Sequence, residues 1–197
     1  MSIIKKNHDL IDKIIQISKK AGKSILEIYY SNPNYYLKDD KTPVTEADIE
    51  SHRIISKELN KITPEIPILS EEQSEIAFDI RSSWKRYWLV DPLDGTKEFI
   101  KKNDEFTVNI ALIENHNPII GLIHNPVLNT TYWGSELGAF FSKNNNASKK
   151  ISVNKNQQIK PRIICSRSHK SDELEIFLQS IGKHQIINAG SSLKFCE

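Results

Sequence analysis

Two aspartates, three residues apart, directly follow a strongly apolar segment of the sequence. Asp91 and Asp94 come after the apolar run 87–90, and Gly95 follows them. Ligands of layered sheets tend to bind where strands end. The two carboxylates, with the carbonyl oxygen of Leu93 between them, form a set of hard oxygen donors of the kind that Mg²⁺ prefers. The alternative is an ordinary Asp-Gly turn closed by an aspartate side chain, and this motif alone does not choose between the two.

A second acidic pair also follows an apolar run. Glu71 and Glu72 come after Ile68-Leu69-Ser70. Glutamates behind a strand are usually only solvated. Two acidic clusters at neighbouring strand ends, however, repel each other unless a cation lies between them. Together the clusters therefore favour a metal site.

The third acidic element is Thr45-Glu46-Ala47-Asp48. Thr45 and Asp48 have the spacing of a helix capping box, with Thr45 as the N-cap. The functional alternative makes Asp48 part of a pair that activates water. The spacing does not separate these two interpretations.

Other routes to phosphate or metal chemistry are missing from the sequence. Its 7 glycines form neither G-x-G-x-x-G nor G-x-x-x-x-G-K-[ST], the two glycine-rich phosphate loops. Its 6 histidines form no zinc-binding pair, and its 2 cysteines are isolated, which fits a reducing compartment. Phosphate chemistry would therefore depend on metal ions, helix N-termini or basic side chains.

The surrounding pattern predicts helices and strands that would position these residues. Apolar residues at helical spacing indicate a helix over 7–30, and a second is expected over 45–60. The hairpin turn of the sheet is predicted at 115–118 and a surface loop at 143–150. Strands are predicted at 66–69, 87–90, 108–113, 119–124 and 151–153. After the loop we expect a strand at 162–165, a helix at 171–181, a strand at 186–188 and the start of a helix from 191. The mixture predicts an α+β protein with layered helices and mixed sheets.

Length and composition limit the number of domains and the class of protein. With 197 residues, 38% hydrophobic residues and a net charge of +2, the chain is long enough for one domain, or for one domain and part of a second. The balanced charge argues against a disordered chain or one that binds nucleic acid polymers. No apolar run reaches 18 residues, so no transmembrane segment is expected. The charged N-terminus does not resemble a secretory signal, and we therefore expect a cytoplasmic location.

The segment Asp91-Pro92-Leu93-Asp94-Gly95-Thr96, taken with the two upstream acidic motifs, resembles the inositol monophosphatase superfamily of metal-dependent, lithium-sensitive phosphatases. The segments 97–100, 105–109, 166–169 and 190–196 are similar to its 3'(2'),5'-bisphosphate nucleotidase branch. The similarity runs from about Lys19 to the last residue.

The resemblance implies a layered α-β-α-β-α sandwich. Residues 1–145 would form an N-terminal α+β subdomain with the metal site, and 146–197 the beginning of a C-terminal α/β subdomain. Two or more Mg²⁺ ions are expected, with inhibition by lithium. The implied metal ligands are Glu71, Asp91, Asp94 and the Leu93 carbonyl. Asp48 and Thr96 match the pair that positions and deprotonates the attacking water.

The resemblance also implies a small-molecule substrate. Adenosine 3',5'-bisphosphate would lose its 3'-phosphate to give AMP, in support of sulfate assimilation. The alternative substrate is an inositol monophosphate. Gly95 and Thr96 would offer backbone amides to the scissile phosphate, close to Glu71, Leu93 and Asp94. The residues that match the nucleotide-binding positions of the branch are Ser166, His169, Ser191 and Lys194.

The family pattern extends beyond the segment 190–194. Members continue with further helices and strands and with a Trp-Asp motif whose aspartate is another metal ligand. The resemblance therefore implies a C-terminally incomplete chain, and a weakly active or inactive nucleotide- or metal-binding relative is a further alternative. Members of the branch are also described as peripheral at the cytoplasmic face of the inner membrane.

Overall fold

A mixed seven-stranded sheet is the centre of the protein. The computed structural model describes the chain except residues 1–2, 32–34, 38–42, 154–159, 169–170 and 197. The strands follow the order of the sequence across the sheet, β3-β4-β5-β6-β7-β8-β9. The first pair is parallel and every other pair is antiparallel. The strands are β3 (Ile68–Ser70), β4 (Arg86–Asp94), β5 (Thr107–Glu114), β6 (Asn117–Asn125), β7 (Thr130–Ser135), β8 (Gly138–Lys143) and β9 (Lys149–Ile151).

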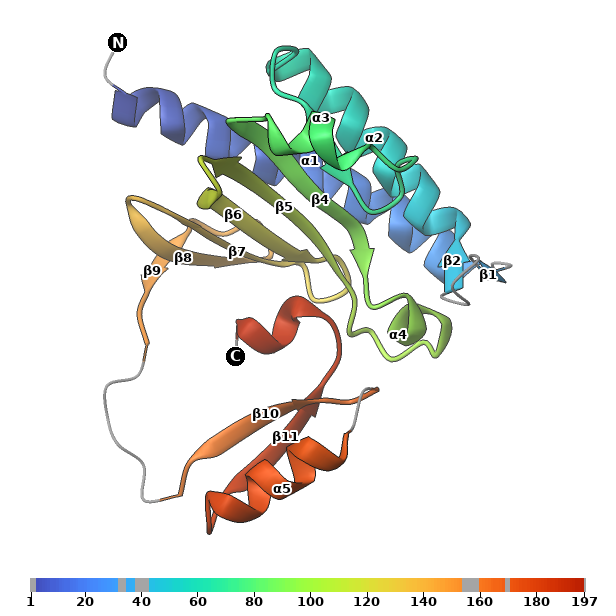
Figure 1. The fold of residues 1–197 in the computed structure, drawn as a ribbon, viewed down its shortest axis with the longest axis vertical. Coiled ribbons are helices and arrows are strands. Elements are labelled where there is room, and N and C mark those ends of the chain that lie inside the picture. Colours follow the sequence, from blue (N-terminus) through green and yellow to red (C-terminus); the bar gives the residue numbers. More distant parts are fainter. Residues whose placement is uncertain (1–2, 32–34, 38–42, 154–159, 169–170, 197) are drawn as a thin grey trace.

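Two long helices, α1 (Ile3–Tyr30) and α2 (Glu46–Ile62), cover one face of this sheet (Figure 1). Burying an apolar face against a sheet is what makes such helices stable. The side chains that form this core are almost completely buried and include Ile14, Ile25, Ile55, Leu59, Trp88, Val108 and Ile110. The predicted helices over 7–30 and 45–60 are confirmed, because each coincides with one of these two.

The C-terminal part adds three further layers. A short 3₁₀ helix, η1 (Ser192–Phe195), contacts β5 and β6 on one side and β10 on the other. Strands β10 (Arg162–Ser166) and β11 (Gln185–Ala189) form a parallel two-stranded sheet, beyond which lies α5 (Asp172–Ser180) (Figure 1). The order of layers is therefore helix, sheet, helix, sheet, helix, and the predicted α+β architecture is confirmed.

The hairpin between β5 and β6 is formed as predicted. Glu114 pairs with Asn117, so only two residues make the turn. Asn115 and His116 both have left-handed backbone conformations, with φ of 48° and 65°. Such φ values are typical of tight hairpin turns, and asparagine adopts them more readily than most residues do.

Several elements differ from those expected. Strands β7 and β8 were not predicted, because their glycine, serine and threonine residues interrupt the apolar pattern. Strand β9 begins inside the predicted surface loop and pairs with β8, so it belongs to the larger sheet. The pair of short strands β1 (Tyr35–Leu37) and β2 (Pro43–Thr45) and the helix α3 (Phe78–Ser82) were also not predicted.

Strand β4 does not end at Val90, as the predicted strand at 87–90 does, but continues through Pro92 to Asp94. Proline cannot donate to a strand ladder and is tolerated where no such bond is needed. On one side of β4, the pairing with β3 stops at Val90. On the other side, the register with β5 shifts between Asp91 and Asp94. Pro92 therefore lies at a local irregularity that requires no hydrogen bond from its nitrogen.

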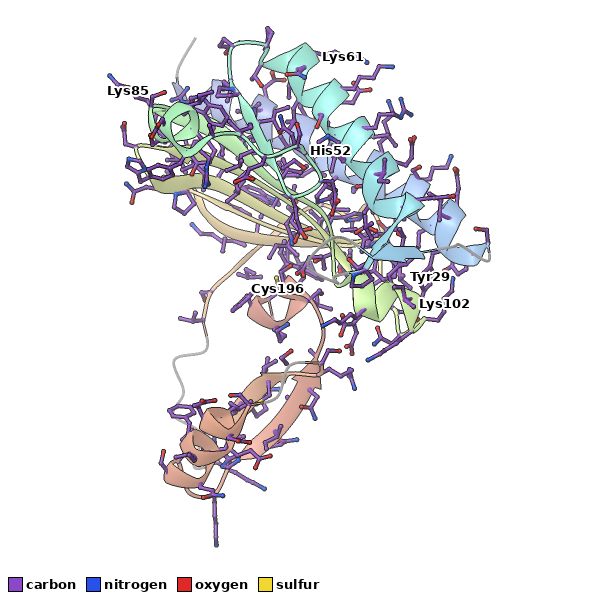
Figure 2. All side chains as sticks on the ribbon, turned by 45° about the vertical axis from the view of Figure 1, so that its right-hand side comes forward. Tyr29, His52, Lys61, Lys85, Lys102 and Cys196 are labelled. Atoms are coloured by element: carbon purple, nitrogen blue, oxygen red, sulfur yellow. The ribbon has the colours of Figure 1, made fainter. Side chains whose placement is uncertain are left out.

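The loop that follows the short helix α4 (Thr96–Ile100) is attached to the end of α1. The Tyr29 hydroxyl donates a hydrogen bond of 2.7 Å to the Asp104 carboxylate. The Lys102 ammonium lies 4.2 Å from the centre of the Tyr29 ring (Figure 2). In the part of the chain that the structure describes, we find no helix with the length and apolar character needed to cross a membrane.

Candidate active site at the end of strand β4

The register shift near the end of β4 brings its two aspartates together. Side chains three residues apart in a regular strand point to opposite faces. Here Asp91 lies opposite Asn109 and Asp94 opposite Thr107, with an irregularity between the two pairs. Between these two pairs β4 has one residue more than β5, and this extra residue changes the alternation of side chains, as a β-bulge does. The negative charge of Asp94 is consequently close enough to raise the pKa of Asp91.

Strand β3 brings the second acidic motif to the same place. It runs parallel to β4, with Ser70 opposite Val90. The backbone N–H of Glu71 donates to the Val90 carbonyl at 3.1 Å, one residue before Asp91. The two acidic clusters that the sequence analysis singled out therefore meet at one edge of the sheet.

One face of α2 supports both strand ends. The Ser51 hydroxyl donates to the Pro92 carbonyl at 2.8 Å, and Nδ1 of His52 lies 2.8 Å from the Ser70 hydroxyl. Together with Asp48, these side chains are at positions i, i+3 and i+4 of the helix and so share a face. Ser51 and His52 were not predicted, although their spacing from Asp48 was a usable signal.

Asp48 caps α2 and also accepts a hydrogen bond from Thr96. Its Oδ2 accepts hydrogen bonds from the backbone N–H of Thr45 at 2.8 Å and from the Thr45 hydroxyl at 2.6 Å, which completes the capping box. Its Oδ1 accepts a hydrogen bond of 3.1 Å from the Thr96 hydroxyl. Burial raises the pKa of Asp48, and the hydrogen bonds from Thr45 oppose this shift. The carboxylate is thus a better base than an exposed aspartate.

The electrostatics of Asp91 favour the binding of a cation. Burial, followed by the charges of Asp94 and Glu71, raises its pKa to about 8. Its Oδ1 is buried and has no hydrogen-bond partner among the described residues. A divalent cation would remove both penalties, because it would pair the oxygen and neutralise the neighbouring charges. Carboxylate oxygens are also the donors that Mg²⁺ prefers.

The carboxylates do not form a ready-made cage. Within the residues that the structure describes, no three histidine, cysteine, aspartate or glutamate side chains form a group that could hold a metal ion. One oxygen of Asp94 instead accepts a hydrogen bond from the backbone N–H of Ser192. The donors fit Mg²⁺ by their chemistry, and their assignment as ligands stays a prediction.

Gly95 allows the chain to turn from β4 into α4. Its φ of 94° is in the left-handed region, which favours glycine. A Cβ at this position would lie 3.0 Å from the Glu105 carbonyl oxygen and 3.2 Å from Cβ of Ser191. Three segments therefore approach each other closely at Gly95.

The predicted substrate-side residues are only partly brought together. Ser191 is buried beside Gly95, and the Lys194 ammonium donates to the carbonyl of Ser191. Ser166 is half-buried at the end of β10, whose neighbour in space is η1. His169 lies outside the described residues. The roles of these side chains in binding stay predictions.

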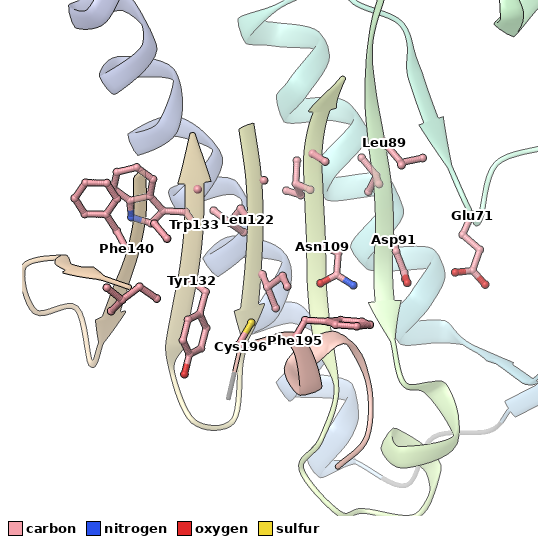
Figure 3. Close-up of a pocket in the computed structure, with 18 of the residues that line it drawn as sticks. Glu71, Leu89, Asp91, Asn109, Leu122, Tyr132, Trp133, Phe140, Phe195 and Cys196 are labelled. Carbon is pink, nitrogen blue, oxygen red and sulfur yellow. The ribbon is translucent and has the colours of Figure 1, made fainter. Parts of the chain in front are cut away.

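A groove of about 1080 Å³ runs from the carboxylates across the sheet face opposite α1 and α2 (Figure 3). Glu71 and Asp91 line one end, where Phe195 projects over the strands. Most of the remaining lining is apolar and comes from β4 to β9, with Leu89, Tyr132 and Phe140 among it. The groove thus joins an acidic end to a long apolar surface, which the sequence analysis did not predict.

Comparison with known proteins places these features in a wider context. Residues 6–196 match the inositol monophosphatase family, a match that begins before the Lys19 expected from the motifs. The 3'(2'),5'-bisphosphate nucleotidase CysQ of Salmonella typhimurium is 46% identical over 189 residues, which are 95% of this chain and 75% of that protein.

Solved structures agree with this match. The crystal structure of CysQ from Bacteroides thetaiotaomicron superposes with a TM-score of 0.78 at 35% identity and covers 92% of this chain and 73% of that one. An inositol monophosphatase/NADP phosphatase, solved with Mg²⁺ and phosphate, has a TM-score of 0.76 at 17% identity over 96% of this chain and 69% of that one. At that identity the second structure shows the fold alone.

Proposed function

The chain belongs to the inositol monophosphatase family, and we propose that it is a magnesium-dependent 3'(2'),5'-bisphosphate nucleotidase. Its reaction is the hydrolysis of the 3'-phosphate of adenosine 3',5'-bisphosphate to AMP and inorganic phosphate. The substrate class is supported by the Salmonella typhimurium relative that is 46% identical. The reaction class is supported by one observation above all, the hydrogen bond between Thr96 and Asp48 beside the Asp91 carboxylate.

This hydrogen bond suits the activation of water. Because the Thr96 hydroxyl donates its proton to Asp48, its oxygen lone pairs are available to accept a hydrogen bond from a water molecule. The raised pKa of Asp48 favours uptake of a proton through this pair as the water attacks. The water oxygen forms a bond to phosphorus as its proton passes to the Thr96–Asp48 pair. The bond between phosphorus and the 3' oxygen breaks, and that oxygen takes a proton from solvent water and leaves as a hydroxyl group. No covalent bond to the protein is needed.

Mg²⁺, when bound, would neutralise the charge of the phosphate and lower the pKa of water. Glu71, Asp91, Asp94 and the Leu93 carbonyl would hold two or more such ions, and lithium is expected to inhibit. Support comes from the unpaired oxygen and the raised pKa of Asp91. Isothermal titration with Mg²⁺ counts the ions independently of turnover.

A comparison of two substrates tests the proposed activity. Phosphate release is measured with adenosine 3',5'-bisphosphate and with inositol 1-phosphate, each with Mg²⁺ and with EDTA. We expect kcat/KM for the bisphosphate to exceed that for the inositol ester at least about 100-fold, because a second charged group adds charge-assisted contacts. A preference for the inositol ester, or equal rates in EDTA, would refute the proposal.

A further inference from the structure

One carboxylate joins three segments that are far apart in the sequence. Glu105 lies in the loop between α4 and β5. Its Oε1 accepts a hydrogen bond of 2.6 Å from Nη2 of Arg167, and its Oε2 accepts one of 2.8 Å from Nε of the same side chain. Oε2 also accepts a hydrogen bond of 2.7 Å from the backbone N–H of Gly190. Glu105 therefore holds the residue after β10 and the residue after β11 at the same time.

The contact at Gly190 leaves almost no free space. A Cβ there would lie 2.5 Å from Cγ of Glu98 and 3.1 Å from Oε2 of Glu105. Glu98 is itself buried, with 4% exposure, and accepts a hydrogen bond from the Ser168 hydroxyl. Two glutamates from the segment that follows β4 in the sequence thus enclose the backbone of Gly190.

Gly190 leads directly into the part of the chain that reaches the active site. The next residue, Ser191, lies over Gly95, and the backbone N–H of Ser192 donates to Asp94. Ser191 has a φ of 48°, which is unfavourable for a residue other than glycine. Such a conformation persists only where surrounding contacts hold it. The hydrogen bond from Gly190 to Glu105 holds Ser191 on its N-terminal side. On its C-terminal side, Ser192 is held by hydrogen bonds with Asp94, Thr107 and Asn109.

Glu105 is attached to the N-terminal layers through its neighbour Asp104. The Asp104 carboxylate accepts a hydrogen bond from the hydroxyl of Tyr29 at the end of α1. The Asp104 carbonyl accepts one of 3.1 Å from the side-chain amide of Asn125 at the end of β6. The loop that carries Glu105 is therefore held by two elements of the main core.

We propose that Glu105 is a positioning residue for substrate binding, which keeps the segment Gly190–Lys194 aligned with the catalytic end of β4. It acts through that segment. The inference rests on the proposed function, since Ser191 and Lys194 match nucleotide-binding positions of the branch. The Lys194 ammonium is a suitable point charge for the non-reacting 5'-phosphate. Asp94 is held independently by β4, so loss of Glu105 weakens substrate binding far more than it slows the chemical step.

The test separates binding from catalysis. Glu105→Ala removes both contacts, whereas Glu105→Gln keeps an acceptor for Gly190 and loses the charge that pairs with Arg167. For Glu105→Ala we expect KM for adenosine 3',5'-bisphosphate to rise at least about tenfold, as for a lost charge-assisted hydrogen bond, with kcat changed less than about threefold. KM for adenosine 3'-monophosphate, which lacks the 5'-phosphate, should rise much less. Glu105→Gln should give an intermediate KM.

The matched control is Glu114→Ala, which removes another partly exposed arginine–glutamate pair, Arg86–Glu114, at the opposite end of β4. It should leave both KM values unchanged. Calorimetric binding of AMP provides a second measurement without turnover, and Glu105→Ala should weaken this binding about tenfold as well. Thermal unfolding verifies that the variants fold. If Glu105→Ala does not fold, the KM values and the AMP affinity of Glu105→Gln test the positioning role.

The two possible failures are distinguishable. Absence of bisphosphate hydrolysis by the unmodified protein refutes the proposed function, and AMP binding still decides the role of Glu105. Unchanged KM and AMP affinity in a folded Glu105 variant refute the positioning role. An equal rise in KM for both adenosine phosphates also refutes it, because a merely structural defect does not distinguish the two substrates.

Discussion

The Thr96 hydroxyl donates a hydrogen bond of 3.1 Å to Oδ1 of Asp48, although the two residues are 48 positions apart. Thr96 is the first residue of α4, and Asp48 is in the first turn of α2. The bond therefore connects the N-terminal ends of two helices at the point where β4 ends. A single carboxylate thus caps one helix and orients a side chain of the other.

Substitution of Thr96 tests this pair. Thr96→Val keeps the shape of the side chain and removes the hydroxyl, so we expect kcat to fall at least about 100-fold, the usual size of a general-base contribution. Thr96→Ser keeps the hydroxyl and should retain kcat within about tenfold, since the hydrogen bond can still form. Steady-state phosphate release measures both. Equal losses in the two variants would show that the hydroxyl is not what matters.

The charge of Asp94 tests the predicted metal site. Without a metal ion, the raised pKa of Asp91 means that the folded protein binds more protons than the unfolded chain between its ordinary pKa near 4 and about 8. The free energy of unfolding of the metal-free protein should therefore fall as the pH rises through this window. Asp94→Asn removes one repelling charge and keeps an oxygen that can accept the Ser192 hydrogen bond, so it should reduce this fall.

Urea unfolding with EDTA and with Mg²⁺ at several pH values measures this effect. Mg²⁺ should stabilise the unmodified protein more than Asp94→Asn, and the variant should have no measurable turnover. Asp79→Asn, an exposed aspartate in α3, is the charge-matched control. Retained turnover in Asp94→Asn would refute its assignment as a metal ligand.

Gly95→Ala tests the close approach of three segments. The substitution forces a non-glycine residue to a φ of 94° and places a Cβ 3.0 Å from the Glu105 carbonyl oxygen. We expect a loss of about 1–3 kcal/mol of stability, as for other strained positions, together with reduced activity. Gly121→Ala is the control, because a Cβ at Gly121 has no atom within 4 Å. Chemical denaturation compares the two, and equal stability of both variants would contradict the expected strain.

The buried His124 should make the stability of the protein depend on pH, independently of the active site. Its buried ring, with Nδ1 3.0 Å from the Thr130 carbonyl, has a pKa lowered by burial to about 4. The unfolded chain binds the proton near pH 6.5. Stability should therefore be lost as the pH falls from about 6.5 towards about 4, by up to roughly 3 kcal/mol.

Replacement of this histidine isolates its contribution. His124→Gln should lower stability at pH 7 and flatten the dependence between about pH 6.5 and about pH 4, because no proton binds at this position. His116→Asn, at an exposed turn, should leave the slope unchanged. Denaturant unfolding at a series of pH values gives the slopes. A slope in His124→Gln as steep as in the unmodified protein would assign the effect to another group.

The local parts of the site could be predicted from the sequence. The apolar run before Asp91 predicts a strand, Gly95 predicts a turn, and the spacing of Thr45 and Asp48 predicts a helix start. Each of these features depends on neighbours within a few residues. The pairing of Asp48 with Thr96 came from the family resemblance, and the structure confirms that the two side chains meet.

The longer-range parts could not be predicted in this way. The hydrogen bond from Gly190 to Glu105 joins residues 85 positions apart, and no periodic pattern encodes it. The continuation of β4 through Pro92 depends on where β3 stops pairing, which is a property of the assembled sheet. Strands β7 and β8 are placed by their pairing with β6, with each other and with β9, and this pairing is a property of the assembled sheet.

The hydrogen bond between Ser192 and Asp94 closes a chain segment of 98 residues. The entropy lost on closure grows with the length of such a segment, so contacts of this kind tend to form after local ones. Strands β5 and β6 are joined by a two-residue turn and need no such closure. We therefore expect the large sheet to be complete while Asp94 still lacks this partner. During folding, the sheet that carries the carboxylates should therefore form before the active site is complete.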